Sequence, residues 1–475
     1  MRKPLALCVI TVFSLFSCSN SQTKSESKKA VSKTIASGTN TSDTSEKNDT
    51  KSSNEDIILT MPIMIDHPFY FDTRDLVQEF NDSDNGYKIV LKNYAEGLNM
   101  ENISEKTDWD NYNLDLTMDI MKGGEFDIIP NIFTDPGKFH ALTEKGAFAD
   151  LNPFIDDDKN LDRSELFDEV LQACEINDEL RYMPISFTID TLAGPSKYVG
   201  NEKNWTFEEM KERWEKMPEG STINGHTTKD YVYYALLRGN ISRFIDYDKA
   251  ECHFNSDEFI NILDFLNSFE DLTGFKQEIN GTSEEFVSEF AISGFKQYHQ
   301  MFWRYPAEEL TFIGYPSDDG CGSFFNIEND QVAVSATSSS EKQKGAWEFI
   351  RMLVSYDCQY GNGFTGVLGD DGEFALPINK KAFEDMGKDQ YSHEDGKAID
   401  EFTGQEVTGV YLTKAEYQKL ADFIPTIKKV NVAMERDIFE IINDEIFALF
   451  AGEKTSKEVA ENIQNRVELL VNERI

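Results

Sequence analysis

The first hydrophobic pattern in the chain is a short apolar run behind two basic residues. Arg2 and Lys3 precede an apolar stretch over residues 4–16. This run is shorter than the roughly 20 residues that a membrane-spanning helix needs. A basic start followed by a short apolar run is typical of a secretory signal. We therefore expect the chain to be exported.

The next segment is almost entirely polar. Residues 19–54 consist mainly of Ser, Thr, Lys, Asn, Glu and Asp, with scarcely an aliphatic side chain. Such a segment cannot bury enough apolar surface to offset the entropy lost on ordering. We expect a flexible tether.

Alternating short apolar runs and helical spacing begin after the tether. Residues 57–65 and 87–91 have the length and composition of strands, and apolar positions between 70 and 80 have helical spacing. This order predicts a β-α-β unit with a parallel crossover. A second helix that ends at Gly123-Gly124 and a strand over 126–129 repeat the pattern. Ligands in open α/β sheets bind beyond the carboxyl ends of strands, so the loops after Ile65 and Ile129 are the first candidates.

The rest of the chain mixes helices with two further strands. Two capping boxes, Thr206 to Glu209 and Thr455 to Glu458, predict helix starts. Apolar spacing predicts further elements: helices over 257–269 and 340–356, strands over 310–316 and 331–336, and two helices at the end of the chain. Trp205, Trp214 and Trp347 fall at helix starts or on helix faces, and we interpret them as structural.

Size and charge limit the function classes. About 420 residues remain after the signal and the tether, which is more than one core usually serves, so we expect two lobes. The formal net charge of -40 argues against nucleic acid or an anionic lipid surface as a partner. The four cysteines of the body, Cys174, Cys252, Cys321 and Cys358, allow zero to two disulfides.

Metal sites are not expected. The six histidines are scattered, so a zinc site is not indicated. Residues 156–162 place oxygens at alternate positions as a calcium loop does, but Phe167 stands where the twelfth-position glutamate would be. A turn that leads into a capped helix explains the same residues. We expect no metal and no cofactor.

Residues 15–18, LFSC, resemble the lipobox of bacterial lipoproteins. The resemblance implies a diacylglycerol on Cys18, cleavage before it, and anchoring at the outer face of the cytoplasmic membrane. Residues 1–18 would then be the lipoprotein signal peptide. The alternative is an ordinary signal peptide with a chance cysteine, but a cleavage site of the A-x-A type is missing.

The body resembles the extracellular solute-binding proteins, family 1, of ABC importers. The resemblance is carried by ordered segments from Ile57 to Glu473: VQEFNDSDNGYKIVLKNY, LDLTMDIMKGGEFDII, KGAFADLNPFIDDDKNLD, LRYMPISFTIDTL, NWTFEEMKERWEKMPEG, KQKGAWEFIRMLVS, PINKKAF and ALFAGEKTSKEVAENIQNRVELLVNE. It implies a two-lobed α/β periplasmic-binding-protein-like fold, a hinge of three crossings and a ligand cleft between the lobes.

The implied lobe boundaries follow from the expected crossings. Lobe 1 would comprise residues 55–188 and 312–383, and lobe 2 residues 189–311 and 384–475. The crossings would lie near 186–190, near 309–312 and around Phe383.

A sugar cleft needs aromatic faces for the C–H side of the rings and polar side chains for the hydroxyls, since a buried hydroxyl without a partner costs free energy. The candidate ligand-binding residues are Asp66, His67, Asn131, Phe133, Asp135, Ser186, Phe187, Thr188, Tyr298, Trp303, Arg304, Ser323 and Phe324. Tyr298 and Trp303 are the candidate stacking platform, and Arg304 could instead bind a carboxylate. The alternatives are a turn or cap for Asp66 and His67, and packing for the aromatic and strand residues.

The function implied is capture of a small solute, an oligosaccharide by preference, and its delivery to an ABC permease. The chain lacks a phosphate-binding G-x-x-x-x-G-K-[ST] motif, so nucleotide hydrolysis would belong to another polypeptide. We expect no enzyme activity. Two alternatives stay open: a lipoprotein that presents ligand to a membrane sensor, and an exported glycosidase, because 86 acidic residues can supply two carboxylates. Peptides, polyols and polyamines are alternative ligands.

Overall fold

The computed structural model describes residues 56–64, 74–94, 106–237, 241–246, 249–271, 284–305, 309–317, 319–327, 331–360, 375–391, 397–399, 406–408, 412–431 and 435–474. All of them belong to one compact unit, Asn54–Ile475. The predicted signal peptide, the tether and the lipid attachment site Cys18 lie outside the described residues. Among the described residues, no helix is long and apolar enough to cross a membrane.

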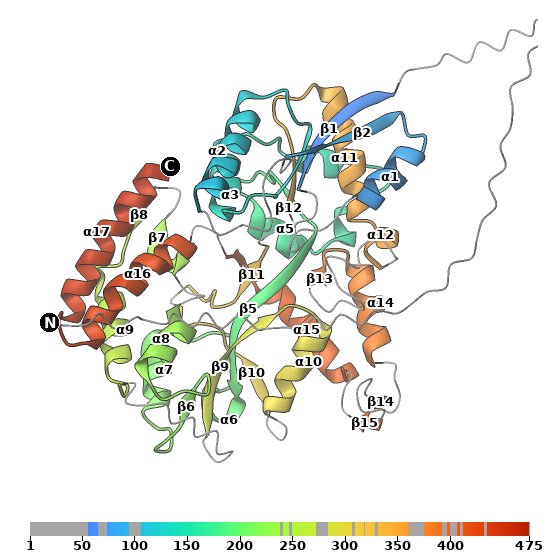
Figure 1. Cartoon of the computed structure of the whole chain (residues 1–475). Coiled ribbons are helices and arrows are strands. Elements are labelled where there is room, and N and C mark those ends of the chain that lie inside the picture. The colour runs from blue at the N-terminus through green and yellow to red at the C-terminus, as the bar shows by residue number, and fades with distance from the viewer. Residues whose placement is uncertain are drawn as a thin grey trace, which may run out of the picture. The chain divides into compact units, whose positions relative to one another are not determined.

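The predicted β-α-β unit is present at the start of the unit (Figure 1). Strands β1 (Ile57–Ile63) and β2 (Tyr87–Asn93) pair in parallel, with helix α1 (Arg74–Asp82) between them in the chain. Helix α2 (Lys106–Lys122) precedes β3 (Ile128–Pro130), and Gly123 and Gly124 both have positive φ. The parallel pairing and the glycine-terminated helix are therefore confirmed.

One buried carboxylate ties the first strands to the helix that follows β12 (Gln331–Val334). Asp127, 5% exposed, accepts hydrogen bonds from the Thr60 backbone N–H at 3.0 Å and from Ser338 Oγ at 2.6 Å. Lys342 Nζ, on α11 (Ser340–Leu353), lies 2.8 Å from the same carboxylate. β12 is the central strand of the sheet β3-β12-β4, in which β4 is Met183–Pro184. A buried charge with this many partners holds three chain segments together.

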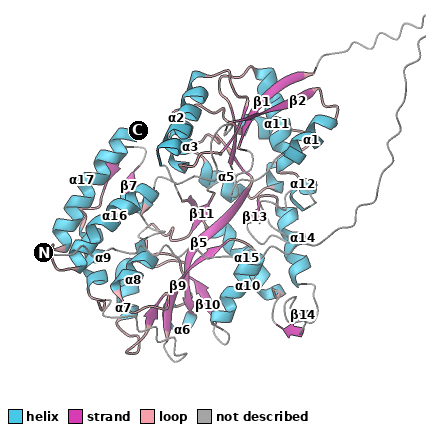
Figure 2. Cartoon of the chain, in the orientation of Figure 1, coloured by secondary structure: helices cyan, strands magenta, loops and turns pink. Residues whose placement is uncertain are grey.

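A larger sheet is organised around one long strand, β5 (Ser186–Pro195), which runs through the middle of the unit (Figure 2). Its strand order is β16-β11-β5-β9-β6, and β10 and β13 pair with β5 as well. The partners are β16 (Lys429–Val430), β11 (Phe324–Asn326), β9 (Glu285–Ile292), β6 (Thr222–Ile223), β10 (Leu310–Phe312) and β13 (Leu376–Pro377). Segments far apart in the chain therefore meet on β5.

Helices and short hairpins cover these sheets. The remaining helices are α3 (Pro136–Glu144), α4 (Asn152–Asp157), η2 (Arg163–Glu165), α5 (Asp168–Cys174), α6 (Ser196–Val199), α7 (Phe207–Trp214), α8 (Lys229–Leu237), η3 (Ser242–Phe244), α9 (Asp257–Asn267), α10 (Phe295–Arg304), α12 (Tyr356–Tyr360), α14 (Lys380–Tyr391), α15 (Lys414–Phe423), η4 (Ile424–Thr426), α16 (Glu435–Phe450) and α17 (Ser456–Arg474). The remaining strands form the pairs β7 (Ile245–Asp246) with β8 (Glu251–Cys252), and β14 (Lys397–Ile399) with β15 (Glu406–Thr408).

Both predicted capping boxes are confirmed. Thr206 accepts from the Glu209 backbone N–H while the Glu209 side chain accepts from the Thr206 N–H. Thr455 and Glu458 make the same reciprocal pair of bonds at the start of α17. Such caps satisfy helix N–H groups that have no intrahelical partner.

Several predicted elements end earlier than the sequence indicates. The strand predicted over 310–316 stops at Phe312, because Gly314 turns with φ +78° and the Tyr315 N–H donates to the Gly322 carbonyl instead. The helix predicted over 340–356 ends at Leu353, and Tyr356 starts the separate helix α12. The strands β5 and β9, which dominate the larger sheet, were not expected over their full lengths.

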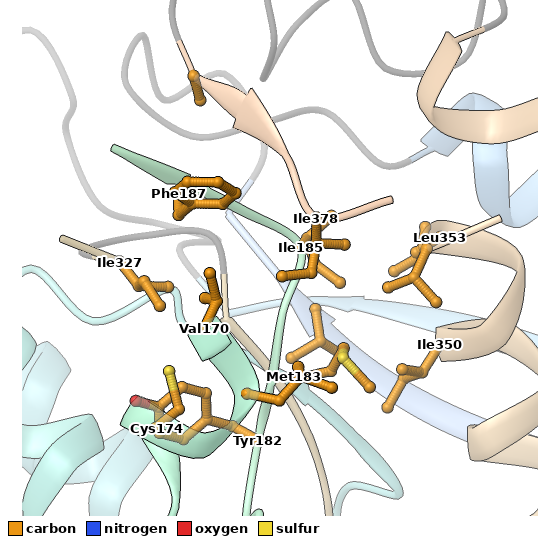
Figure 3. Packing of buried hydrophobic residues seen from close by; sticks show 14 of the residues in the cluster. Val170, Cys174, Tyr182, Met183, Ile185, Phe187, Ile327, Ile350, Leu353 and Ile378 are labelled. Atoms are coloured by element: carbon orange, nitrogen blue, oxygen red, sulfur yellow. The ribbon is translucent and has the colours of Figure 1, made fainter. Parts of the chain in front are cut away.

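The buried apolar side chains form two clusters. The first cluster includes side chains of β1, β3, β12 and α11, and Figure 3 shows part of it, with Phe187 near Val170 and Ile327. The second cluster contains α7, α8, α9, α16 and α17. Cys174, Cys252, Cys321 and Cys358 are all free thiols, so no disulfide joins these four residues.

The predicted lobe boundaries stay a prediction. The side chains of β5 divide between the clusters, with Ile189 in the first and Leu192 in the second. Phe312 and Ile313 divide in the same way at the second expected crossing. Beyond Phe383, however, Leu420 and Phe423 still pack in the first cluster.

Candidate functional site

The two clusters lie on opposite faces of β5. The register pairs Phe325 with Ile189, and Ile189 with Ile292 on the other side, and all three side chains belong to the first cluster. Successive side chains of a strand point to opposite faces. Leu192 and Phe324, on the other face, accordingly belong to the second cluster. One strand thus joins both cores.

A row of polar side chains lies on the second face, where β5, β11 and β16 run side by side. Thr188 pairs with Asn326, and Asn326 Nδ2 lies 3.4 Å from Asp190 Oδ2. The Asn431 N–H donates to the Phe325 carbonyl at 2.7 Å, which continues the register of β16 by one residue and places Asn431 beside Asn326. Thr188, Asp190, Asn326 and Asn431 are all half-buried. We call these four residues the hinge-strand row, after the hinge that the sequence predicts near this strand.

The hinge-strand row has the chemistry of a polyhydroxyl site. Two side-chain amides can each donate and accept, the hydroxyl can do both, and the carboxylate accepts. Because these groups are partly buried, their hydrogen bonds are electrostatically stronger than they would be in bulk water. Residues from three chain segments therefore present donors and acceptors on one face, next to the second cluster.

An ion pair lies beside the row. Lys429 of β16 is the register partner of Phe324 in β11. Its ammonium group forms an ion pair with Asp319, which lies in the loop before β11. Burial by itself would raise the pKa of Asp319, but hydrogen bonds from Lys429, Ser317 and the Cys321 backbone lower the pKa to about 2. The pair links β16 to the loop that leads into β11.

The predicted loop after β3 is held tightly by its neighbours. Asn131 is 2% exposed, and its Nδ2 donates to Gln331 Oε1 at 2.7 Å. Phe133 is 1% exposed, with its ring 6.4 Å from that of Phe139. Asp135 caps α3 by accepting from the Gly137 N–H. These contacts are those expected if the loop residues serve packing and helix capping. A ligand role for them stays a prediction.

The other predicted residues on β5, on β11 and just before β11 have partners within the protein. The Phe187 ring packs against Phe167 and Phe325 on the first face. Ser323 Oγ lies 2.8 Å from Thr191 Oγ1, and both residues are buried. Ser186 is fully buried, and Phe324 packs against Tyr315 with a ring separation of 6.1 Å. Of the residues predicted on these strands, only Thr188 belongs to the hinge-strand row.

The aromatic helix α10 carries three of the predicted ligand residues, and the side chain of only one of them, Tyr298, is described. Tyr298 is fully buried, its ring packs against Phe302, and its hydroxyl donates to the Glu416 carbonyl at 3.0 Å. Burial raises the pKa of that hydroxyl. Burial would also raise the pKa of Glu416, but hydrogen bonds from His299 and Thr413 lower it. The side chains of Trp303 and Arg304, and the whole of Asp66 and His67, lie outside the described residues.

Sequence reasoning missed three members of the row. Asp190 was expected only as the limit of a crossing, and Asn326 and Asn431 were not singled out. The alternation of apolar and polar residues in FTID, residues 187–190, was the available signal. Asn326 and Asn431 stand in separate short strands, and only the tertiary pairing reveals them.

No group of three or more His, Cys, Asp or Glu side chains among the described residues could hold a metal ion. In the segment that resembles a calcium loop, Asp158 accepts from Trp347 Nε1 at 2.6 Å. Asp162 forms a capping box with Glu165 at the start of η2. These contacts confirm the turn and cap expected there.

Comparison with known proteins agrees with this architecture. No family model matches the chain, and no curated protein matches it. Among solved structures, an extracellular solute-binding protein family 1 from Alicyclobacillus acidocaldarius has a TM-score of 0.50 and 12% identity, and the match covers 88% of this chain and 98% of that one. The sugar-binding protein MalE from Xanthomonas citri has a TM-score of 0.51 and 12% identity, with the same coverage of 88% and 98%.

A de novo designed cysteine esterase is also similar, with a TM-score of 0.52, 17% identity, and coverage of 88% of this chain and 99% of that chain. Likeness at these identities concerns the fold and leaves the activity open. The predicted fold class is confirmed: the chain has the two-lobed α/β fold of the extracellular solute-binding proteins.

Proposed function

We propose that the protein is an extracytoplasmic, lipid-anchored solute-binding protein that captures an oligosaccharide and delivers it to an ABC permease. The observation that carries the proposal is the hinge-strand row of Thr188, Asp190, Asn326 and Asn431. It lies where β5 and β11 run side by side, and each of these strands has side chains in both hydrophobic clusters. A ligand bound there would contact the segment through which the two cores are joined.

Carbohydrate is the ligand class that suits these groups. A sugar hydroxyl both donates and accepts, so it can satisfy an amide and a carboxylate at once. One of the similar structures is named as an extracellular solute-binding protein, and another is named as a sugar-binding protein. Asp66, His67 and Trp303 remain proposed ligand groups, together with the other residues predicted from the sequence.

Membrane anchoring is proposed from the sequence alone. Cys18 would carry the diacylglycerol, and residues 19–54 would act as the tether. Two acyl chains suffice for stable anchoring. Mass spectrometry of the mature N-terminus should find acylated Cys18, and a Cys18→Ser chain should lose the acyl mass. An unmodified N-terminus elsewhere would contradict the proposal.

Thermal unfolding of the purified mature chain tests the ligand. Oligosaccharides, amino acids, peptides and polyamines would be added separately, at concentrations far above the expected dissociation constants. Ligand at a hundredfold excess over Kd stabilises the folded state by about 2.7 kcal/mol, which gives an easily measured rise in Tm. We expect a rise with one class of oligosaccharide. A rise only with another class would reassign the ligand.

Two further measurements separate the alternative functions. Chromatography of the bound sugar after long incubation should recover it unchanged, whereas shorter products would indicate a glycosidase. Deletion of the gene should abolish uptake of the radiolabelled sugar. Normal uptake in the deletion strain would favour a lipoprotein that presents its ligand to a sensor.

A further inference from the structure

A cavity of about 480 Å³ lies away from the hinge-strand row, at the end of α7 and of α9. Its lining includes the apolar side chains Trp214, Met217 and Phe265 and the charged side chains Lys211, Glu215 and Glu219. The volume falls within the range of small-molecule sites. None of these residues belongs to the hinge-strand row or to the predicted ligand residues.

The apolar floor of this cavity is held in place by the second cluster. The Trp214 ring lies 5.3 Å from the Phe269 ring and 5.7 Å from the Phe286 ring. Phe265 is 6% exposed and packs edge-on against Phe207 of α7 at 5.4 Å. Trp214 itself is only half-buried. Aromatic neighbours on the inner side therefore hold an indole that still reaches the cavity.

The charged groups at the rim lack partners within the described part of the chain. The structure gives no hydrogen bond or ion pair there to the side chains of Lys211, Glu215 or Glu219. On the same helix, by contrast, Arg213 pairs with Glu202. The two hydroxyls in the lining, Ser221 and Ser268, donate to the Pro218 and Phe265 carbonyls, so their oxygens remain able to accept.

Together, the aromatic surface and the charged groups of the lining suit a saccharide. An apolar aromatic surface suits the C–H face of a pyranose ring. An ammonium that donates and carboxylates that accept suit the hydroxyls around that ring. We propose that this cavity, which we call the Trp214 cavity, is a second carbohydrate-binding site that takes one or two sugar units. The site goes beyond the proposed function, because it would hold saccharide at a surface separate from the hinge-strand row.

The Met217 methyl group allows the site to be observed directly. The full mature chain would be labelled with ¹³C in its methionine methyl groups, and the Met217→Leu chain would assign the signal. Maltotriose and cellotriose would be titrated separately, and phenylalanine would represent a ligand of a different class. We expect the Met217 signal to shift with at least one trisaccharide, because a sugar beside Trp214 changes the magnetic environment of the methyl group.

Substitutions that remove charge then test the charged side chains of the lining. The Lys211→Gln/Glu219→Gln chain should bind the trisaccharide at least about fivefold more weakly, which corresponds to about 1 kcal/mol. Glu212→Gln provides the matched control, because Glu212 is exposed on the same helix and does not line the cavity. An unchanged titration in the rim variant, or a Met217 signal that responds only to phenylalanine or to neither trisaccharide, would overturn the proposal.

The hinge-strand variant Asp190→Asn/Asn326→Ala keeps this test separate from the proposed function. Its Met217 titration should equal that of the unmodified chain, while its Tm rise with sugar should fall to the part that the Trp214 cavity contributes. Loss of the Met217 shift in this variant would show that the signal reports the hinge-strand row, which would also overturn the second site. A Met217 shift, together with a Tm rise that is the same in this variant and in the unmodified chain, would leave the second site and contradict the proposed function.

Discussion

The two faces of β5 differ in what they contribute. One face carries Ile189 between Phe325 and Ile292, all fully buried, and it completes the first cluster. The other face carries Thr188 and Asp190 beside Asn326, all half-buried. The backbone and the hydrogen-bonded ladder are common to both faces, so the difference comes from the side chains alone. A strand can therefore hold a core together and present polar groups, because its side chains alternate.

The comparison implies that substitutions on the two faces have separable consequences. The apolar face should affect the free energy of unfolding and leave ligand affinity unchanged in the folded fraction. Substitutions in the hinge-strand row, on the other face, should do the reverse.

Ile189→Ala should produce the largest loss of stability. Removing buried aliphatic atoms costs their transfer free energy and leaves a cavity, about 2–5 kcal/mol for such a change. Denaturant unfolding measures the loss. Ile58→Ala is the matched control, because Ile58 is 49% exposed on β1 and its substitution should change stability by about 0.5 kcal/mol or less. Equal effects of the two substitutions would contradict the assigned packing.

Asn326→Ala should mainly weaken ligand binding. Loss of an amide that bonds a sugar hydroxyl costs about 1–3 kcal/mol, a factor of roughly 5 to 150 in Kd. Calorimetric titration with the sugar found by the thermal screen measures it, and Asn201→Ala, at an exposed position, is the control. Undiminished affinity in Asn326→Ala would remove the hinge-strand row from the site.

Tyr298→Phe tests a residue predicted as a stacking platform. The hydroxyl donates to the Glu416 carbonyl from a fully buried position, so its removal should destabilise the chain by about 0.5–1.5 kcal/mol. Tyr231→Phe, where the residue is 38% exposed, should have little effect on unfolding. Loss of ligand affinity in Tyr298→Phe at unchanged stability would favour the ligand role that the sequence suggests.

Asp319→Asn should produce the smallest effect, visible only in acid. The pKa of Asp319 is lowered from 3.8 to about 2, so its ion pair stabilises the folded chain above pH 3.8. That contribution is lost as the pH falls from 3.8 to about 2. The unmodified chain should therefore lose more stability over this interval than Asp319→Asn. Half-exposure of Asp319 keeps the effect small and sensitive to salt.

Identical acid unfolding of the two chains at low salt would contradict this role of the ion pair. A difference that persists unchanged at high salt would point to another interaction, because the Asp319–Lys429 pair is exposed to solvent.

Local patterns were sufficient for elements that depend on near neighbours. The capping box at Thr206 and Glu209 involves residues three positions apart, so both of its hydrogen bonds can be inferred from the sequence. The glycine pair after α2 marks the helix end in the same way. The broken strand after Phe312 could not be inferred locally, because the competing bond from Tyr315 reaches Gly322 across a turn.

The sequence by itself determined the α/β class, the parallel β1–β2 unit and the helix starts, because side-chain periodicity and capping act over a few residues. Only the tertiary structure decided that Thr188 and Asp190 share a face with Asn326, and that Phe187 and Tyr298 pack in the core. Asp190 and Asn326 lie 136 positions apart in the chain. Strand pairing over such a separation depends on the collective burial of both cores, and no local pattern records it.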